Sequence, residues 1–141
     1  MTIALASDHA GFLLKEYIKK YFIKNHIEIL DLGTDSEKSV DYPDFGELIA
    51  KNILDGKADR GVAMCGTGIG ISIAVNRYRG IRAALCDAPE TAEIARRHND
   101  ANILVFGARL ISKTTAVSCI NTFFNTPFDG GRHALRTKKL G

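Results

Sequence analysis

Short apolar runs alternate with amphipathic segments along all 141 residues, and this alternation constrains the fold more than any other feature. The apolar runs cover residues 3–7, 27–32, 61–65, 81–86 and 103–106. Uninterrupted apolar runs of this length are typical of strands that are buried on both faces of a parallel sheet. The segments between them space their apolar residues as helices do, for example Leu14, Ile18 and Phe22. The sequence therefore predicts an α/β protein with a five-stranded parallel sheet.

Helix signals fix the connections between these strands. Pro43 suits the start of a second helix, and residues 71–77 suit a short third one. The stretch 87–90 has the spacing of a helix cap, for a helix that ends near His98. Ser112 can cap a last long helix, which residues 126–131 break. We expect one doubly wound domain over residues 1–141, with residues 130–141 as a basic C-terminal segment. Ligands of such folds bind at the carboxyl ends of the strands.

A glycine-rich loop, Gly66 to Gly70, follows the third expected strand. Alternate glycines there let backbone N–H groups converge beside a helix start, which suits an anion or a developing oxyanion. The loop has no lysine, so it is not a Walker A motif, and Ile71 replaces the third glycine of a dinucleotide fingerprint. The alternative is a tight turn that binds nothing.

Polar residues with possible chemical roles follow the strands. Cys65 precedes the glycine loop, where a helix start favours the thiolate, although a packed core cysteine fits equally well. Asp8 and His9 follow the first strand and suit acid–base or anion-binding roles, or simply a helix cap. His98 and Asn99 end a helix, which by itself is an ordinary C-terminus. Residues of this kind around one crevice would suit a small phosphorylated substrate and proton transfer.

The C-terminal segment is basic. Arg132 and Arg136 are four residues apart and share a face if the segment is helical, so they could clamp a phosphate; a solvated tail is the alternative. The net charge of +3 is too small to indicate nucleic-acid binding. No apolar run approaches the ~18–20 residues of a membrane span, and the N-terminus lacks signal-peptide features. We expect a cytoplasmic protein that binds neither membranes nor nucleic acids.

Six motifs occur in order: SDHAG, DYP, CGTGIGISIAVN, RHNDAN, FGAR and GGRH. With them the whole chain resembles the type B ribose-5-phosphate isomerases, a family that includes galactose-6-phosphate isomerase. The resemblance implies a Rossmann-like three-layer α/β/α sandwich and interconversion of ribose 5-phosphate and ribulose 5-phosphate through an enediolate. It also implies that no metal or cofactor is needed, and that the protein works as a homodimer or a dimer of dimers with shared active sites.

The resemblance implies a role for each motif residue. Cys65 would be the base that moves a proton between C2 and C1, and His98 would open the furanose ring, with Asp8 assisting at the sugar hydroxyls. The enediolate oxygens would be held by Thr67 and by the amides of Gly66, Gly68, Ile69 and Gly70. Substrate would otherwise be bound by Asn99 and Tyr42 at the sugar and by His9, Arg109, Arg132 and Arg136 at the phosphate. The partner chain would supply His98, Asn99 and Arg109.

Two alternatives stay open from the sequence. One is an isomerase of a six-carbon sugar phosphate, such as allose or galactose 6-phosphate. The other is a non-catalytic sugar-phosphate-binding module, which would explain the arginines and the glycine loop but would give Cys65 and His98 no role. Cys65 itself, with Ile69 in the loop, places the chain in the branch of the family that uses cysteine as the base.

Overall fold

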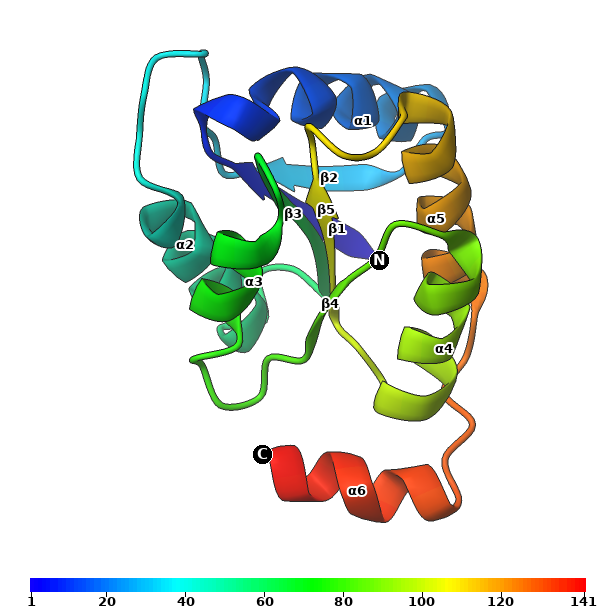
Figure 1. Ribbon diagram of the computed structural model, residues 1–141. Helices are drawn as coiled ribbons and strands as arrows, with labels where there is room; N and C mark the ends of the chain where they lie inside the picture. The colour runs from blue at the N-terminus through cyan, green and yellow to red at the C-terminus, as the bar shows by residue number, and fades with distance from the viewer.

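The five expected strands form one parallel sheet in the computed structural model, which describes residues 1–141 (Figure 1). Their order across the sheet is β2-β1-β3-β5-β4. The bounds are β1 Thr2–Ser7, β2 Glu28–Asp31, β3 Arg60–Cys65, β4 Ala83–Leu85 and β5 Ile103–Gly107. The chain reverses its direction of winding between β1 and β3, so the loops after these two strands flank the switch point where such sheets bind ligands.

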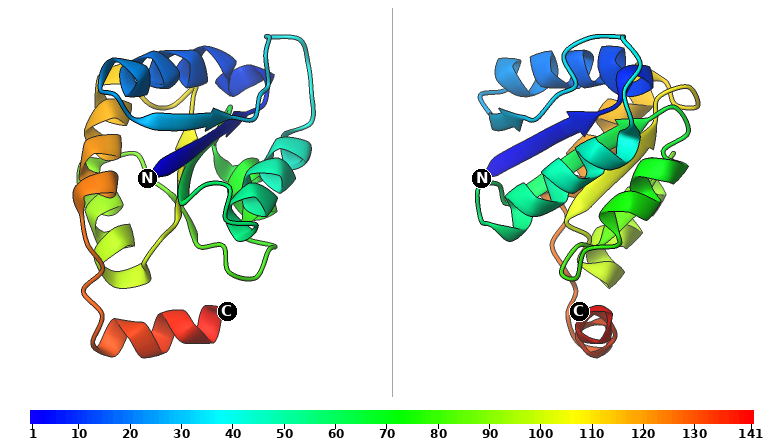
Figure 2. Two further views of the ribbon diagram at one scale, coloured as in Figure 1. Left: turned by 180° about the vertical axis from the view of Figure 1, so that it is seen from behind. Right: turned by 90° about the vertical axis from the view of Figure 1, so that its left-hand side faces the viewer.

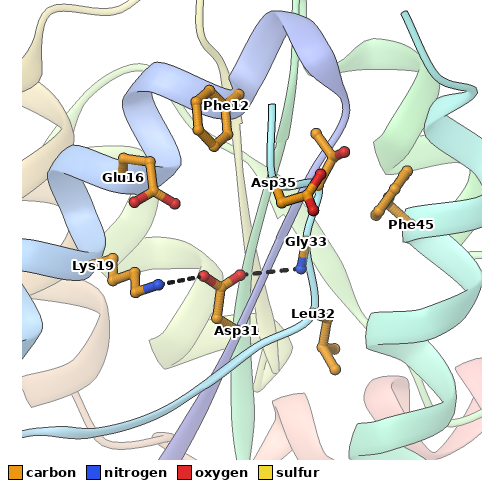
Figure 3. Close-up of a pocket in the computed structure, with 9 residues that line it drawn as sticks. Phe12, Glu16, Lys19, Asp31, Leu32, Gly33, Asp35 and Phe45 are labelled. Atoms are coloured by element: carbon orange, nitrogen blue, oxygen red, sulfur yellow. Dashed lines mark hydrogen bonds and ion pairs between the residues drawn. The ribbon is translucent and has the colours of Figure 1, made fainter. Parts of the chain in front are cut away.

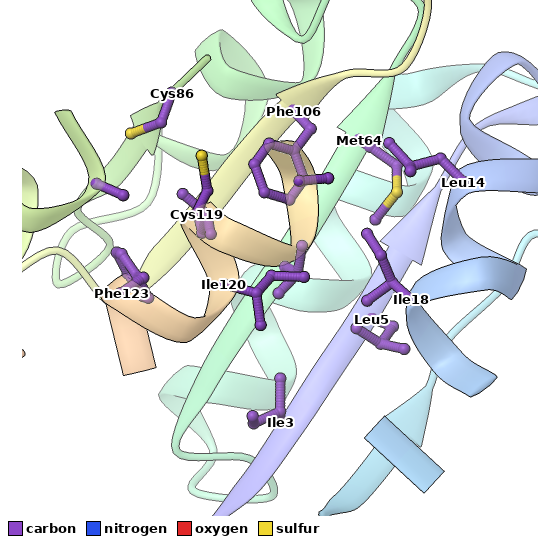
Figure 4. Packing of buried hydrophobic residues seen from close by; sticks show 14 of the residues in the cluster. Ile3, Leu5, Leu14, Ile18, Met64, Cys86, Phe106, Cys119, Ile120 and Phe123 are labelled. Carbon is purple, nitrogen blue, oxygen red and sulfur yellow. The ribbon is translucent and has the colours of Figure 1, made fainter. Parts of the chain in front are cut away.

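Alternation along each strand divides the core into two layers. Ile3 and Leu5 of β1 face one side of the sheet, while Ala4 and Ala6 face the other. The first side packs against α1 (Phe12–Lys24), α4 (Pro89–Asn99) and α5 (Lys113–Asn125), as Figure 4 shows for its larger side chains. The second side packs against α2 (Tyr42–Leu54) and α3 (Ile69–Val75) (Figure 2). The three-layer α/β/α sandwich is therefore confirmed, and both faces of the sheet are covered.

Three boundaries differ from the sequence expectation. Helix α3 begins at Ile69, inside the stretch expected to be loop, because Gly68 already turns the chain with a φ of 77°. Helix α4 has Ala88 at its N-cap with no side-chain cap bond, so the cap expected over residues 87–90 does not form. Strand β4 is only three residues long, since the ends of the run 81–86 leave the sheet. A short 3-10 turn, η1 His9–Gly11, precedes α1.

The basic C-terminal segment is a helix, α6 Arg132–Leu140. None of its residues is buried, and Figure 1 shows it set apart from the sandwich, beyond the end of α4. Its tertiary support is limited, chiefly to contacts with α4 and, at its C-terminal end, with Arg79. None of the helices combines the length and the apolar character that crossing a bilayer requires.

Candidate active site

Glycine is required in the loop between β3 and α3 because the loop touches the end of β5. A Cβ atom at Gly68 would lie 2.5 Å from Leu85 Cδ1 and 2.8 Å from the carbonyl carbon of Phe106. A Cβ atom at Gly107 would lie 2.4 Å from the Thr67 carbonyl oxygen. The loop is therefore held close to the carboxyl edge of the sheet. Gly68, the N-cap of α3, has no side chain to cap the first N–H groups of that helix.

Cys65 ends β3 immediately before this loop and is 4% exposed. Its side chain points to the α2 and α3 side of the sheet, as the alternation with Met64 requires. Its carbonyl oxygen accepts a hydrogen bond from the Ala108 N–H at 2.9 Å, and the Gly66 carbonyl accepts one from the Arg109 N–H at 2.9 Å. The turn after β5 is thus fixed against the thiol and its loop.

Two further predicted side chains reach the same loop. A Cβ atom at Gly66 would lie 2.7 Å from a terminal nitrogen of Arg109, and a Cβ atom at Gly70 would lie 2.6 Å from the Tyr42 ring. The Arg109 guanidinium therefore lies beside the loop of its own chain. The Thr67 hydroxyl accepts a hydrogen bond from the Ile69 N–H at 3.3 Å.

Asp8 and His9 lie next to this group, at the end of β1. The Asp8 N–H donates to the Met64 carbonyl at 3.3 Å, which joins the ends of β1 and β3. Asp8 is 6% exposed and its carboxylate accepts the Gly11 N–H at 3.1 Å, so it does cap the 3-10 turn, as the simpler interpretation proposed. The Nδ1 atom of His9 lies 3.1 Å from the Val40 nitrogen and 3.2 Å from its carbonyl oxygen. Its Nε2 is the nitrogen left for a ligand.

His98 and Asn99 lie at the other end of the strands, near the amino ends of β3 and β4. The Asn99 carbonyl accepts a hydrogen bond from Arg82 Nε at 3.1 Å, just before β4 begins, and the Asn102 carbonyl accepts the Gly61 N–H at the start of β3. Cys65 is at the other end of that six-residue strand, about 17 Å away at the roughly 3.3 Å rise of a parallel strand. His98 therefore cannot meet Cys65 within one chain, and the expectation of one shared crevice is wrong for a single chain.

His98 forms a second cluster with the start of α6. Its ring stacks on the ring of His133, with 4.3 Å between centroids and 9° between planes. The two histidines line a cavity of about 370 Å³ together with Asn99, Arg136, Thr137 and Leu140. His133 ends the GGRH motif but was interpreted as a surface residue, because only the return of α6 onto α4 brings it to His98.

The cluster also contains Asp129. One ligand atom from each of Asp129, His98 and His133 lies within 4.8 Å of the other two, a spacing at which three residues can hold a metal ion. Stacked parallel rings, however, direct their nitrogen lone pairs side by side in separate planes, so both cannot point at one ion. Asp129 is also paired with Arg97 at 3.2 Å. The present geometry is that of a histidine pair and not of a metal centre.

The largest cavity, about 750 Å³, holds none of the predicted residues (Figure 3). It lies between α1 and the end of β2, around Asp31. Burial raises the pKa of Asp31, but hydrogen bonds from Lys19, Lys15 and the Gly33 N–H outweigh burial and lower it. The Lys15 ammonium, 1% exposed, is 2.9 Å from Asp31 and 2.9 Å from Glu16. These charges neutralise one another, so the cavity is a structural ion-pair network and we assign it no ligand.

Comparison with known proteins gives close matches over the whole chain. A family model described as Ribose/Galactose Isomerase matches residues 3–140. The crystal structure of a ribose 5-phosphate isomerase from Thermotoga maritima is 55% identical with a TM-score of 0.97, and the match covers 99% of this chain and 96% of that chain. The ribose-5-phosphate isomerase B of Escherichia coli is 38% identical over 138 residues, which are 98% of this chain and 93% of the relative.

One solved structure carries a ligand in its description. It is the ribose-5-phosphate isomerase B of Mycoplasma genitalium with bound ribulose-5-phosphate, 35% identical with a TM-score of 0.93. The match covers 99% of this chain and 93% of that chain.

Proposed function

Since the chain belongs to the ribose/galactose isomerase family, we propose that it interconverts ribose 5-phosphate and ribulose 5-phosphate through an enediolate. The observation that carries the proposal is the placement of Cys65, a buried thiol directly before a loop of backbone amides. Aldose–ketose isomerisation needs one base that moves a proton between neighbouring carbons and a group of donors that stabilises the charge left behind. The loop and its cysteine supply both.

In the isomerisation step, the thiolate of Cys65 takes the proton from C2 of the open-chain aldose. The electron pair moves through the C1–C2 bond to the carbonyl oxygen and leaves an enediolate. The Thr67 hydroxyl and the amides of residues 66–70 hold its two oxygens. A proton then passes from O2 to O1 of the enediolate, and returning the first proton to C1 gives the ketose, so the same thiol serves as base and then as acid. Asp8, next to the end of β3, accepts hydrogen bonds from the sugar hydroxyls.

Ring opening and phosphate binding use the other residues. His98 gives a proton to the ring oxygen of the furanose, since imidazole titrates near neutrality and can act as a general acid there. Asn99 and Tyr42 bind the sugar. His9, through Nε2, and the three arginines of the site hold the phosphate: Arg109, Arg132 and Arg136. Binding energy from this remote group orients the reacting carbons.

A complete site requires two chains. One half, around Cys65, lies at the carboxyl edge of the sheet, and the other, around His98, lies at the amino edge. A second copy whose α4 and α6 approach the glycine loop would join the two halves, and a two-fold dimer would form two such sites. The exposed apolar side chains of α3, Ile69 and Ile73, support a contact there. We therefore propose a homodimer, or a dimer of dimers, with shared active sites.

The direct test is to supply purified protein with ribose 5-phosphate and follow ribulose 5-phosphate formation. We expect turnover in the wild type and in Cys119→Ala, a change at a thiol buried on the opposite side of the sheet from Cys65, and none in Cys65→Ser. Binding without turnover, unaffected by Cys65→Ser, would indicate a non-catalytic module. Preference for allose 6-phosphate would indicate a six-carbon specificity. A cytoplasmic location is part of the same proposal, and cell fractionation tests it.

A further inference from the structure

We propose that His133 is a positioning residue for His98, which fixes the plane of the His98 ring and leaves His98 as the one proton carrier of the pair. The inference rests on the proposed function, in which His98 opens the sugar ring. It adds a residue that the sequence motifs did not single out for any role.

The geometry of the pair supports a positioning role. His98 is the tenth residue of the eleven-residue α4, and His133 is the second residue of α6, and their rings are parallel within 9° at 4.3 Å. One backbone hydrogen bond joins the two segments, from the Asp129 N–H to the Arg97 carbonyl at 3.0 Å. The His133 N–H donates to the Gly130 carbonyl at 3.0 Å within the turn that begins α6. The His133 ring therefore forms a fixed wall against one face of His98, and the edge of His98 stays open to the cavity.

Charge decides which ring carries the proton. Two imidazolium rings at this separation repel each other, so the pair favours at most one proton. His133 faces three groups that oppose its protonation, His98 from α4 and Arg132 and Arg136 from its own helix. The one group that favours its protonation is Asp129, which is already paired with Arg97.

The result is a lowered pKa for His133, caused first by burial and then by these cations. His98 lies in the last turn of α4, at the end of the helix where the dipole favours a cation. The neutral face of His133 also accepts an imidazolium stacked on it. The shared proton therefore resides on His98, where a general acid for ring opening needs it.

The test compares His133→Phe, which keeps a flat ring without a titrating group, with His133→Ala, which removes the ring. His26→Asn, at an exposed turn outside both clusters, is the matched control. Turnover is measured in both directions, because ribulose 5-phosphate has no furanose ring to open. NMR follows the titration of His98 in each variant.

We expect His133→Ala to lower kcat for ribose 5-phosphate about tenfold or more, within the range of general acid–base catalysis, with a smaller effect on ribulose 5-phosphate. His133→Phe should restore most of that loss, and its His98 should titrate in one step where the wild type shows a second inflection from the neighbouring ring. If His133→Ala folds poorly, the kinetics of His133→Phe and the NMR titration of its His98 still test the proposal.

An active wild type whose His98 titration and forward kcat are unchanged by His133→Ala overturns the positioning role and leaves the proposed function intact. A Phe variant as impaired as the Ala variant also overturns it, because the stacking would then have no role. If the wild type itself does not convert ribose 5-phosphate, the proposed function fails, and the role in ring opening fails with it.

Discussion

At the scale of single residues, burial and position separate the three thiols of the chain. Cys119 is fully buried between α5 and the sheet, and burial, with the nearby Cys86 second, raises its pKa to about 11. Burial also raises the pKa of Cys86. Both are core thiols that stay protonated at neutral pH. Cys65 alone lies at the carboxyl end of a central strand, where the loop amides are within reach of the same ligand.

The separate roles proposed for Cys65 and His98 predict that variants of these two residues fail at different steps. Cys65→Ala should abolish turnover in both directions, since it removes the carbon base, whereas His98→Asn should harm turnover of cyclic ribose 5-phosphate far more than turnover of ribulose 5-phosphate. The measurement is the rate in each direction, with solvent-deuterium incorporation at the exchanging carbon. Near wild-type exchange in Cys65→Ala would place the base elsewhere, and equal losses in both directions for His98→Asn would refute its ring-opening role.

Asp31 predicts a pH dependence of stability. Its folded-state pKa is lowered, chiefly because its bonds to Lys19 and Lys15 outweigh the effect of burial. Its contribution is therefore complete above the unfolded pKa of about 4 and is lost as pH falls through the lower, folded value. Asp31→Asn should cost about 3 kcal/mol at pH 7, because it removes a partner of the buried Lys15 ammonium.

Denaturant unfolding at pH 7 and at pH 3 measures this effect. The difference between wild type and Asp31→Asn should shrink at the lower pH. Asp35→Asn, which changes an exposed carboxylate at the same cavity, should show little effect at either pH. A pH-independent difference for Asp31→Asn would mean that its charge is not what stabilises the fold.

At the scale of elements, α6 is the exception in this molecule. Every other helix contributes side chains to a buried core, but α6 buries none and presents arginines from a position beside α4. We infer that its contribution lies in what its surface binds or contacts. Its i, i+4 pair of arginines and the neighbouring histidine pair give it that surface.

Arg132→Ala and Arg136→Ala should therefore raise KM for ribose 5-phosphate about tenfold or more with little change in kcat, because each loses a charge-assisted bond made equally to substrate and transition state. Lys139→Ala, an exposed cation on the same helix, is the control and should leave both constants unchanged. Steady-state kinetics of the three variants tests this, and an unchanged KM in both arginine variants would remove them from the phosphate site.

At the scale of the whole molecule, the group around Cys65 lies at the carboxyl ends of the strands, and the group around His98 lies at their amino ends. We call these groups the two half-sites. That separation predicts recovery of activity on mixing two inactive variants. Cys65→Ala and His98→Ala, unfolded together and refolded, should regain about a quarter of wild-type activity, since random pairing makes half the dimers mixed and each mixed dimer has one intact site of two.

Subunit exchange must be verified separately, for example by mass spectrometry of the mixed dimers. The control mixture combines Cys65→Ala with Thr67→Ala, whose changes fall in the same half-site. It should regain no more than the residual activity of Thr67→Ala itself. Verified exchange without recovery in the first mixture would mean that each site lies within a single chain.

The sequence by itself determined the fold. Strand residues 3–6, 62–65 and 103–106 are apolar without interruption, and such runs are typical of strands buried on both faces of a sheet. Helix caps and glycines then set most boundaries to within a residue or two, as at Ser112, whose hydroxyl accepts the Thr115 N–H at 3.1 Å. Local signals of this kind act over a few residues, so the sequence displays them directly. The glycine loop after β3 was predictable for the same reason.

Only the tertiary structure decided which of the candidate site residues lie together and which lie at opposite ends of the strands. Nothing in the local pattern tells that His98 and Cys65 end up about one strand length apart, because that distance depends on which edge of the sheet each loop meets. The stacking of His133 on His98 likewise depends on the return of α6 across 34 residues of intervening chain. Contacts between residues distant in sequence follow from the packing of whole elements, which no short motif records.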